Sequence, residues 1–320
     1  MSRILTGIQS TGTPHLGNIL GAIVPAIEKS KDNESYLFIA DLHSLTQIKN
    51  STELKENTYS TAAAWLAFGL DTKKTVFYKQ SDVPLTTELA WIISTYFPYK
   101  RLTLAHSFKD KSDNLKDVNV GLFTYPMLMA ADILLYDSNY VPVGKDQLQH
   151  LEITRDVATK FNNKHGETFI LPEAIINEST KYITGTNGDK MSKSKGNIIN
   201  IFLPEKQLKK QIMSIQTDST PLESPKDYKN CNVHKIFKLI AERDHTEIVE
   251  NKYKQGGYGY GHAKSELYEL ILNKFKIQRQ KYSSLMSNKK EIDDVLCKGA
   301  SKALITASDV LRRVKTKLGY

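Results

Sequence analysis

The feature that most constrains this chain is the alternation, over its first 195 residues, of short apolar runs with longer helical patterns. This alternation is typical of a parallel sheet covered by helices, because parallel strands must be joined by long crossover connections. We therefore predict an α/β fold with a doubly wound parallel sheet. The expected strands are Ile4–Gln9, Tyr36–Ala40, Val76–Tyr78 and Tyr140–Val143, and the expected helices are Leu16–Ser30, Glu53–Phe68, Thr86–Phe97, Tyr125–Tyr136 and Gln147–Asn162.

The pattern of expected secondary structure changes after the glycine-rich stretch Gly185–Gly196. Strand-like runs become scarce there, and amphipathic helical patterns such as Ala263–Tyr282 and Ala300–Leu318 dominate. Residues 1–195 carry 21 basic and 21 acidic side chains, whereas residues 196–320 carry 23 basic and 14 acidic ones, the whole net charge of +9. We predict a Rossmann-type domain over 1–195 and a mostly helical, basic domain over 196–320, and we consider that the last helix packs back on the first domain.

Composition and cysteine usage exclude several classes of protein. The chain is 40% hydrophobic and 25% charged and has no run of 18 apolar residues, which excludes a disordered chain, a fibre and a membrane span. Cys231 and Cys297 lie far apart without a CxxC partner, so they form no zinc site alone and fit a reducing compartment. Because Arg3-Ile4-Leu5 and a glycine turn follow Met1 directly, we expect no targeting peptide and a cytoplasmic protein.

The first candidate site is the stretch Gly7–Asn18, in which a predicted strand turns through glycines into a helix. Backbone N–H groups at such a helix start bind anions, and glycines let a phosphate or a base approach closely. Gly12 and Gly17 have the spacing of a P-loop, but Asn18 stands where that motif requires lysine, which argues against that type of kinase or GTPase. The glycines alone are equally compatible with a tight turn.

The second candidate site is Lys190-Met191-Ser192-Lys193-Ser194, which is followed by Lys195 and Gly196. Three ammonium groups this close together can neutralise a triphosphate and the charge that develops on leaving pyrophosphate. Most charge runs are solvated loops, but a five-residue pattern of this kind is specific.

Together the two stretches resemble the signatures of the class I aminoacyl-tRNA synthetases. Pro14-His15-Leu16-Gly17-Asn18 is similar to the HIGH element with Asn in its last position, and Lys190–Ser194 is a complete KMSKS. With Asn in this position, the element resembles that of the synthetase branch that activates tryptophan and tyrosine. We expect His15 to cap or pack at the helix start and assign it no acid–base role.

The predicted helix Tyr125–Tyr136 carries the residues that distinguish these two amino acids. Tyr125, Met129 and Asp132 stand at positions i, i+4 and i+7, so a phenol, a thioether and a carboxylate share one face. A carboxylate in so apolar a helix is costly to bury unless a donor meets it. An indole N–H only donates, so it complements Asp132, and Met129 can pack on a ring. The residues alone also allow a structural hydrogen bond from a neighbouring loop.

The segment Val141–Gln147 places a strand end before a glycine turn and a helix start, where open α/β sheets bind ligands. At this point the chain resembles the tryptophanyl-tRNA synthetase family. The resemblance is dense over Gly7–His43, Phe108–Ser112 and Thr124–Phe161 and continues more thinly, for example through Gly256–Lys264. It implies activation of tryptophan with ATP to give tryptophanyl-adenylate and pyrophosphate, followed by transfer of tryptophan to the 3′ end of tRNA(Trp).

The resemblance also implies roles for matching residues. The ATP site would comprise Gln9, Ser10, Thr11, Gly17, Asn18, Gly144, Lys145, Asp146, Ile183, Lys190, Met191, Ser192, Lys193 and Ser194. The tryptophan site would comprise Asp132 for the indole N–H, Tyr125 and Gln147 for the amino group, and Met129, Val141, Val143, Leu5 and His43 around the ring. The catalytic residues would be Lys111, Lys190 and Lys193, in contact with the phosphates. No protein metal ligand is expected, and Mg²⁺ would arrive with ATP.

Two positions depart from the family pattern. Leu5 stands where an aromatic residue often sits, and Gly188-Asp189-Lys190 is a shorter approach to KMSKS than many relatives have.

The expected partners are tRNA(Trp), gripped by basic helices such as Asn273–Lys281 and Leu311–Lys317, and, by resemblance, a second copy of the chain in a homodimer; no membrane is expected. Three alternatives stay open: a tyrosyl-tRNA synthetase, a cofactor nucleotidyltransferase, and a regulatory RNA-binding paralogue without the chemistry.

Overall fold

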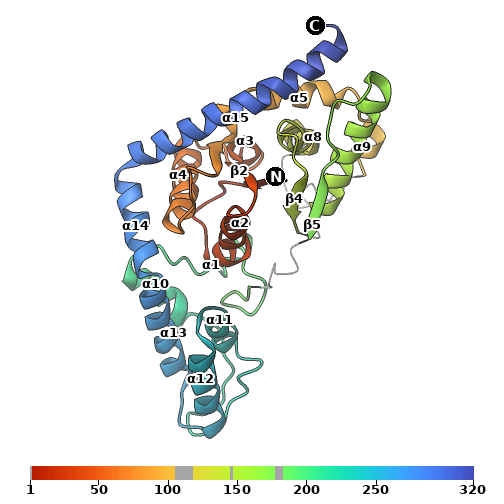
Figure 1. Cartoon of the computed structure of the whole chain (residues 1–320). Helices are drawn as coiled ribbons and strands as arrows, with labels where there is room; N and C mark the ends of the chain where they lie inside the picture. The colour runs from red at the N-terminus through yellow and green to blue at the C-terminus, as the bar shows by residue number, and fades with distance from the viewer. Residues whose placement is uncertain (1, 105–117, 145–146, 177–182) are drawn as a thin grey trace.

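The computed structural model describes residues 2–104, 118–144, 147–176 and 183–320. At its centre lies a five-stranded parallel sheet in the order β3-β2-β1-β4-β5 (Figure 1). The strands are β1 (Arg3–Ile8), β2 (Glu34–Ile39), β3 (Val76–Lys79), β4 (Tyr140–Val143) and β5 (Glu173–Ile176). The predicted α/β class with a doubly wound parallel sheet is confirmed. The sequence analysis missed β5, a short edge strand in which Glu173, Ala174 and Ile176 are exposed.

The helices of the first part of the chain connect these strands. They are α1 (Leu16–Asn18), the π-helical turn η1 (Ile19–Ile23), α2 (Val24–Lys29), α3 (Asp41–Ser44), α4 (Ser51–Ala67), the 3₁₀ turn η2 (Gln80–Asp82), α5 (Leu85–Ser94), α6 (Tyr99–Leu102), α8 (Val120–Leu134) and α9 (Leu148–His165). The predicted helix over residues 16–30 therefore consists of three consecutive pieces, with the wider π turn in its middle.

Strand β2 shows how the sheet acquires two apolar faces. Successive side chains of a strand point to opposite faces. Leu37 and Ile39 accordingly join one hydrophobic cluster with η1, α2 and α4. Tyr36 and Phe38 join a second cluster with α5, α8, α9 and the far half of the last helix. A sheet buried on both faces reads as a nearly continuous apolar run, which is why Tyr36–Ala40 is recognisable as a strand from sequence.

The C-terminal part of the chain is helical, as the sequence indicates. Its elements are the 3₁₀ turn η4 (Lys193–Lys195), α10 (Glu205–Met213), α11 (Asn232–Ile240), α12 (Arg243–Gln255), α13 (Tyr260–Lys274), α14 (Lys276–Ser287) and α15 (Lys289–Leu318). Helices α11 to α13 form one end of the molecule, while α15 runs back across α4, α3 and α5 (Figure 1). The pattern at residues 263–282 divides into two helices at Phe275.

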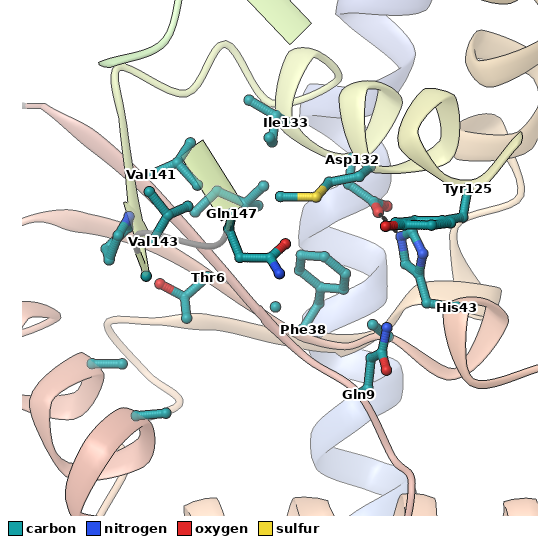
Figure 2. A pocket seen from close by; sticks show the side chains of 18 of the residues that line it. Thr6, Gln9, Phe38, His43, Tyr125, Asp132, Ile133, Val141, Val143 and Gln147 are labelled. Atoms are coloured by element: carbon teal, nitrogen blue, oxygen red, sulfur yellow. Dashed lines mark hydrogen bonds and ion pairs between the residues drawn. The ribbon is translucent and has the colours of Figure 1, made fainter. Parts of the chain in front are cut away.

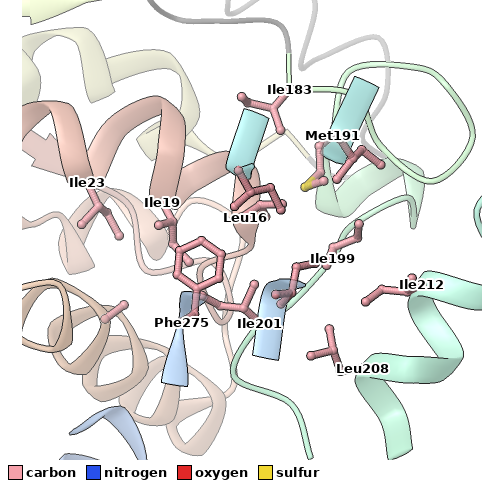
Figure 3. Packing of buried hydrophobic residues seen from close by; sticks show 14 of the residues in the cluster. Leu16, Ile19, Ile23, Ile183, Met191, Ile199, Ile201, Leu208, Ile212 and Phe275 are labelled. Atoms are coloured by element: carbon pink, nitrogen blue, oxygen red, sulfur yellow. The ribbon is translucent and has the colours of Figure 1, made fainter. Parts of the chain in front are cut away.

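One hydrophobic cluster joins the helix after β1 to the chain that follows the KMSKS stretch. Leu16 and Ile19 pack with Ile199 and Ile201, and Phe275 from the α13–α14 junction lies in the same group (Figure 3). The backbone N–H of Leu16 also donates to the carbonyl of Ile199 at 2.8 Å. This shared packing fixes the two signature stretches relative to each other. The division into two domains at residue 195 stays a prediction.

Helix α15 comes close to the sheet at Gly299. A Cβ atom built on Gly299 would lie 1.7 Å from the carbonyl oxygen of Phe77 in β3. Helix α15 and β3 can therefore be this close only where the helix lacks a side chain. Within the described ranges, no helix is both long and apolar enough to cross a membrane.

We expect Gly299→Ala to destabilise the fold, because the obstructing atom belongs to the backbone of β3 and cannot rotate away. Overpacking of this kind costs about 1–3 kcal/mol, which corresponds to a fall in Tm of roughly 2–12 °C. Thermal denaturation followed by circular dichroism measures it. Gly261→Ala in α13, where a new Cβ meets nothing within 4 Å, is the matched control and should leave Tm unchanged or slightly higher. Equal melting temperatures for both variants would contradict this account of the α15–β3 contact.

Candidate active site

A deep cavity of about 490 Å³ opens beside the carboxyl ends of β1 and β4. Asp132, Tyr125 and His43 lie together at one end of it, whereas Val141 and Val143 line the other (Figure 2). The eight residues that the sequence predicts around tryptophan all line this cavity: Leu5, His43, Tyr125, Met129, Asp132, Val141, Val143 and Gln147. These residues come from β1 and β4, from α3 and α8, and from the start of α9. They meet at the carboxyl ends of the strands, where open α/β sheets bind ligands.

Asp132 is the most deeply buried charged group of this cavity, with 2% of its surface exposed. Gln80 Nε2 lies 2.9 Å and 2.8 Å from its two carboxylate oxygens, and His43 Nε2 lies 2.9 Å from one of them. Burial raises the pKa of the Asp132 carboxyl group, while the hydrogen bonds from His43 and Gln80 oppose that rise. The structural hydrogen bonds considered as an alternative from sequence are therefore present, and Asp132 still borders the cavity.

The walls of the cavity are apolar and closely packed. Met129 and Ile133 of α8, Leu5 of β1 and Val141 and Val143 of β4 line it. Phe38 from β2 also lines the cavity, and its ring approaches β1 so closely that a Cβ on Gly7 would lie 2.4 Å from Cζ. Gly7 has no side chain, so the Phe38 ring can approach β1 closely. The ring thus adds an aromatic surface to the wall that contains Leu5.

Other polar side chains line the cavity besides Asp132 and His43. The hydroxyl of Tyr125 lies 2.9 Å from Nε2 of His150, a residue of α9 that is 1% exposed. Gln147 precedes α9, and Gln9 stands just after β1; both side chains line the cavity (Figure 2). A phenol and two amides offer donors and acceptors for a small zwitterion.

A second cavity, of about 730 Å³, is lined by both signature stretches and is called here the loop cavity. It contains ten of the residues predicted for ATP: Gln9, Thr11, Gly17, Asn18, Ile183, Lys190, Met191, Ser192, Lys193 and Ser194. Gln9, Gly21, Ala22 and Gln47 line both cavities, so the two cavities adjoin each other. Two reactants bound in them would meet near Gln9.

Direct contacts hold the two signature stretches together. Lys193 Nζ donates to the carbonyl oxygen of Gly12 at 2.7 Å, and the backbone N–H of Gly17 lies 3.3 Å from Sδ of Met191. Burial lowers the pKa of the Lys193 ammonium to about 8. Lys195 instead forms an ion pair with Asp189 at 3.0 Å. Lys193 is thus the cation of this loop that is held against the glycine turn.

The expectation for His15 is confirmed. His15 is the N-cap of α1: its Nδ1 accepts the backbone N–H of Asn18, and the Asn18 side chain accepts the backbone N–H of His15, which forms a reciprocal capping box. Burial, together with the nearby charge of Lys193, lowers the pKa of His15 to about 4. The ring is therefore neutral at physiological pH and serves the helix start.

Several predicted residues lie elsewhere. Ser10 lines neither cavity, since its side chain is buried against Ser44 Oγ at 3.2 Å and Thr58 Oγ1 at 3.3 Å. Gly144 lines the deep cavity rather than the loop cavity. Lys111, Lys145 and Asp146 lie outside the described residues. Among the described residues, no three His, Cys, Asp or Glu side chains come together as metal ligands.

Sequence reasoning missed Gln80, Phe38 and His150. Gln80 directly follows β3, and Phe38 lies one residue before the end of β2, so the rule applied to the end of β4 would have found both. His150 lies three residues after Gln147, on the inner face of α9, and the sequence carries no separate signal for its contact with Tyr125.

Comparison with known proteins identifies the class. The family described as class I tRNA synthetases (W and Y) matches residues 1–276, and the chain belongs to this family. The tryptophan–tRNA ligase of Campylobacter jejuni strain RM1221 is 47% identical over 99% of both chains, and that of Fusobacterium nucleatum is 47% identical over 100% of this chain and 98% of its own. Membership of the family excludes the cofactor nucleotidyltransferase.

A solved structure agrees with these sequences. The tryptophanyl-tRNA synthetase of Campylobacter jejuni in complex with ADP and tryptophan superposes with a TM-score of 0.96 at 46% identity, covering 99% of this chain and 100% of its own. The Mycoplasma pneumoniae enzyme superposes with a TM-score of 0.82 at 30% identity over 100% of this chain. Both confirm the expected synthetase fold along the whole chain.

Proposed function

We propose that this chain is a tryptophan–tRNA ligase that binds tryptophan in the deep cavity and ATP in the loop cavity. The observation that carries the residue assignment is Asp132, a 2%-exposed carboxylate at one end of a cavity large enough for an indole ring. A site built around a hydrogen bond to one donor rejects analogues that lack this donor strongly. Relatives that share 47% identity over almost the whole chain favour tryptophan over tyrosine as the amino acid.

The reaction has two steps and needs no protein nucleophile. The carboxylate of tryptophan attacks the α-phosphorus of ATP, and the bond to pyrophosphate breaks; the terminal ribose hydroxyl of tRNA(Trp) then takes the acyl group from the adenylate. Tyr125 and Gln147 are assigned to the ammonium group of the substrate, and Gln9 lies where the two cavities meet. The protein contributes by holding both reactants in contact and by stabilising charge.

Lys193 and Lys190 are assigned to the phosphates. Both line the loop cavity, and Lys193 is the one whose ammonium group is already partly removed from water by its contact with Gly12. The described lining of this cavity includes no carboxylate, so it offers no ligand of the type that Mg²⁺ prefers. Mg²⁺ is therefore treated as part of the Mg²⁺–ATP substrate, held by the phosphate oxygens.

The basic C-terminal part is assigned to tRNA. Its net charge of +9 suits a phosphate backbone, and a tRNA-charging enzyme of this kind works in the cytoplasm, where tRNA is used. Several cations of the predicted helices are already engaged. Arg279 donates to the Leu203 carbonyl at 3.0 Å, and Arg313 donates to the Thr168 carbonyl at 2.9 Å. Lys274, Arg312 and Lys315 also have partners. Phosphate contacts from these helices are therefore assigned to exposed lysines such as Lys276, Lys281 and Lys317.

A homodimer is supported by exposed apolar side chains on α5, α6 and the start of α8. Trp91, Tyr99 and Val120 are 76%, 71% and 76% exposed, and the Tyr99 ring packs on Phe123 at 5.5 Å. Large apolar side chains grouped on neighbouring elements mark protein interfaces. Helix α5 packs on α8, and α8 lines the deep cavity, so an interface here would lie close to the amino-acid site.

We expect Asp132→Asn to lose most of its activity with tryptophan. The substitution replaces one acceptor oxygen with an NH₂ group, which would face the donors of Gln80, His43 or the indole. Loss of a hydrogen bond to a charged group costs about 1.5–3 kcal/mol, or roughly 10- to 150-fold in kcat/KM. ATP–pyrophosphate exchange with tryptophan measures this. Asp309→Asn on the surface of α15 is the control and should match the wild type. If Asp132→Asn retained full exchange, the amino-acid site would be wrongly placed.

The pKa of about 8 for Lys193 predicts an alkaline limb in the pH profile. The ammonium form binds phosphate, so kcat/KM for ATP should be level below this pH and fall about tenfold per pH unit above it. Lys193→Arg keeps its charge at high pH and should remove the limb. Lys193→Ala should be slow throughout. An unchanged limb in the arginine variant would show that another group titrates.

Sedimentation velocity tests the dimer. The wild type should sediment as a dimer at micromolar concentration, and Trp91→Lys combined with Val120→Lys should sediment as a monomer, because charges cannot be buried in an apolar interface. Ile277→Lys on α14, where Ile277 is 72% exposed, is the control and should stay dimeric. A monomeric wild type would refute the dimer.

A further inference from the structure

Gln80 is the buried polar residue closest to Asp132 that sequence reasoning left without a role. It is the first residue of η2, directly after β3, and is 1% exposed. Its Nε2 lies 2.9 Å and 2.8 Å from the two oxygens of the Asp132 carboxylate. Gln80 is absent from the described lining of the deep cavity. It can therefore influence a bound amino acid only through Asp132 and His43.

The orientation of the Gln80 amide is fixed from its other end. Gln80 Oε1 accepts the backbone N–H of His43 at 3.4 Å. A backbone N–H can only donate, and a carboxylate can only accept, so the oxygen must face His43 and the NH₂ group must face Asp132. His43 also places its own Nε2 2.9 Å from Oδ2 of Asp132. One short segment, α3, thus anchors both groups that hold the carboxylate.

These contacts leave the carboxylate with acceptor capacity toward the cavity. Two oxygens provide about four lone-pair positions, and the contacts from Gln80 and His43 use three of them. Asp132 also borders the cavity. Gln80 Nε2 bridges both oxygens and His43 contacts only Oδ2, so the two donors together fix the orientation of the carboxylate and the direction of its remaining acceptor position.

We propose that Gln80 is a positioning and specificity-determining residue, which holds the Asp132 carboxylate ionised and aimed at the ring N–H of tryptophan. This inference rests on the proposed function. Without Gln80, a carboxyl group so deeply buried takes up a proton, becomes a hydrogen-bond donor and is free to turn, so it no longer favours a ring that carries an N–H. The direction of the pKa shifts agrees: burial raises the pKa of Asp132, and the Gln80 hydrogen bond lowers it.

Gln80→Met tests the proposal, because methionine has a similar length and cannot donate a hydrogen bond. Pyrophosphate exchange is measured with tryptophan and with its benzothiophene analogue, in which sulfur replaces the ring N–H. We expect kcat/KM for tryptophan to fall about 10- to 100-fold and that for the analogue to change less than about threefold. The preference for the N–H should therefore collapse, while the KM for ATP stays the same. The residual activity with tryptophan should rise with pH, because ionised Asp132 accepts the N–H more strongly than the protonated carboxyl group does.

Gln255→Met, at the exposed end of α12, is the matched control and should behave as the wild type. An equal loss with both substrates would show that Gln80 is merely structural, and no loss with either would show that it has no role; each result overturns the proposal. If Asp132→Asn keeps tryptophan exchange, the proposed amino-acid site itself fails. If only Asp132→Asn loses it, the site stands and the role of Gln80 falls.

Gln80→Glu answers the same question if Gln80→Met does not fold. Two facing carboxyl groups share one proton at low pH, and the protonated carboxyl group introduced by this substitution then donates to Asp132 much as the amide does. Discrimination between tryptophan and the benzothiophene analogue should therefore approach the wild-type ratio at low pH and fall as the pH rises. A ratio that does not change with pH would contradict the proposed role of the Gln80 hydrogen bond.

Discussion

A carboxylate that is buried almost completely can keep its charge only where donors surround it, and this requirement at Asp132 organises the ends of three elements. Helix α8 supplies the carboxylate, the turn after β3 supplies Gln80, and α3 after β2 supplies His43. Each partner comes from the segment that follows a neighbouring strand. The order of strands in the sheet therefore brings the charge and its donors together before any substrate is present.

The second half of the site depends on packing rather than on charge. The KMSKS stretch lies 170 residues or more after the HIGH-like stretch, and it reaches that stretch because Leu16, Ile19, Ile199 and Ile201 share one apolar cluster. The contacts of Lys193 with Gly12 and of Met191 with Gly17 are made on this base. The lysine is held close to the glycine turn at the expense of its hydration, which lowers its pKa and strengthens its attraction for phosphate.

The periodicity of the sequence was sufficient to predict the doubly wound sheet, four of the five described strands and the helices between them, because buried strands and amphipathic helices differ in period. It did not identify β5, because an apolar run of only three residues, Ala174–Ile176, does not by itself distinguish a strand from a loop. It also missed the division at Phe275, which follows from packing against α1 and the segment after KMSKS. The two signatures placed the loop cavity, and the i, i+4, i+7 pattern placed Tyr125, Met129 and Asp132. The sequence analysis did not identify Gln80 and His150, because their roles depend on contacts between segments that are distant in the sequence. Arg279 and Arg313 look like solvated cations in sequence but bind carbonyl groups of other segments.

The missing side chain at Gly299 has a mechanical consequence. Helix α15 follows α14 and runs back past α4 and α5 (Figure 1). At Gly299 its backbone meets that of Phe77, three residues before Gln80. The helix cannot slide or roll without displacing β3. The position of β3, and with it the start of the turn that carries Gln80, is therefore tied to the position of α15.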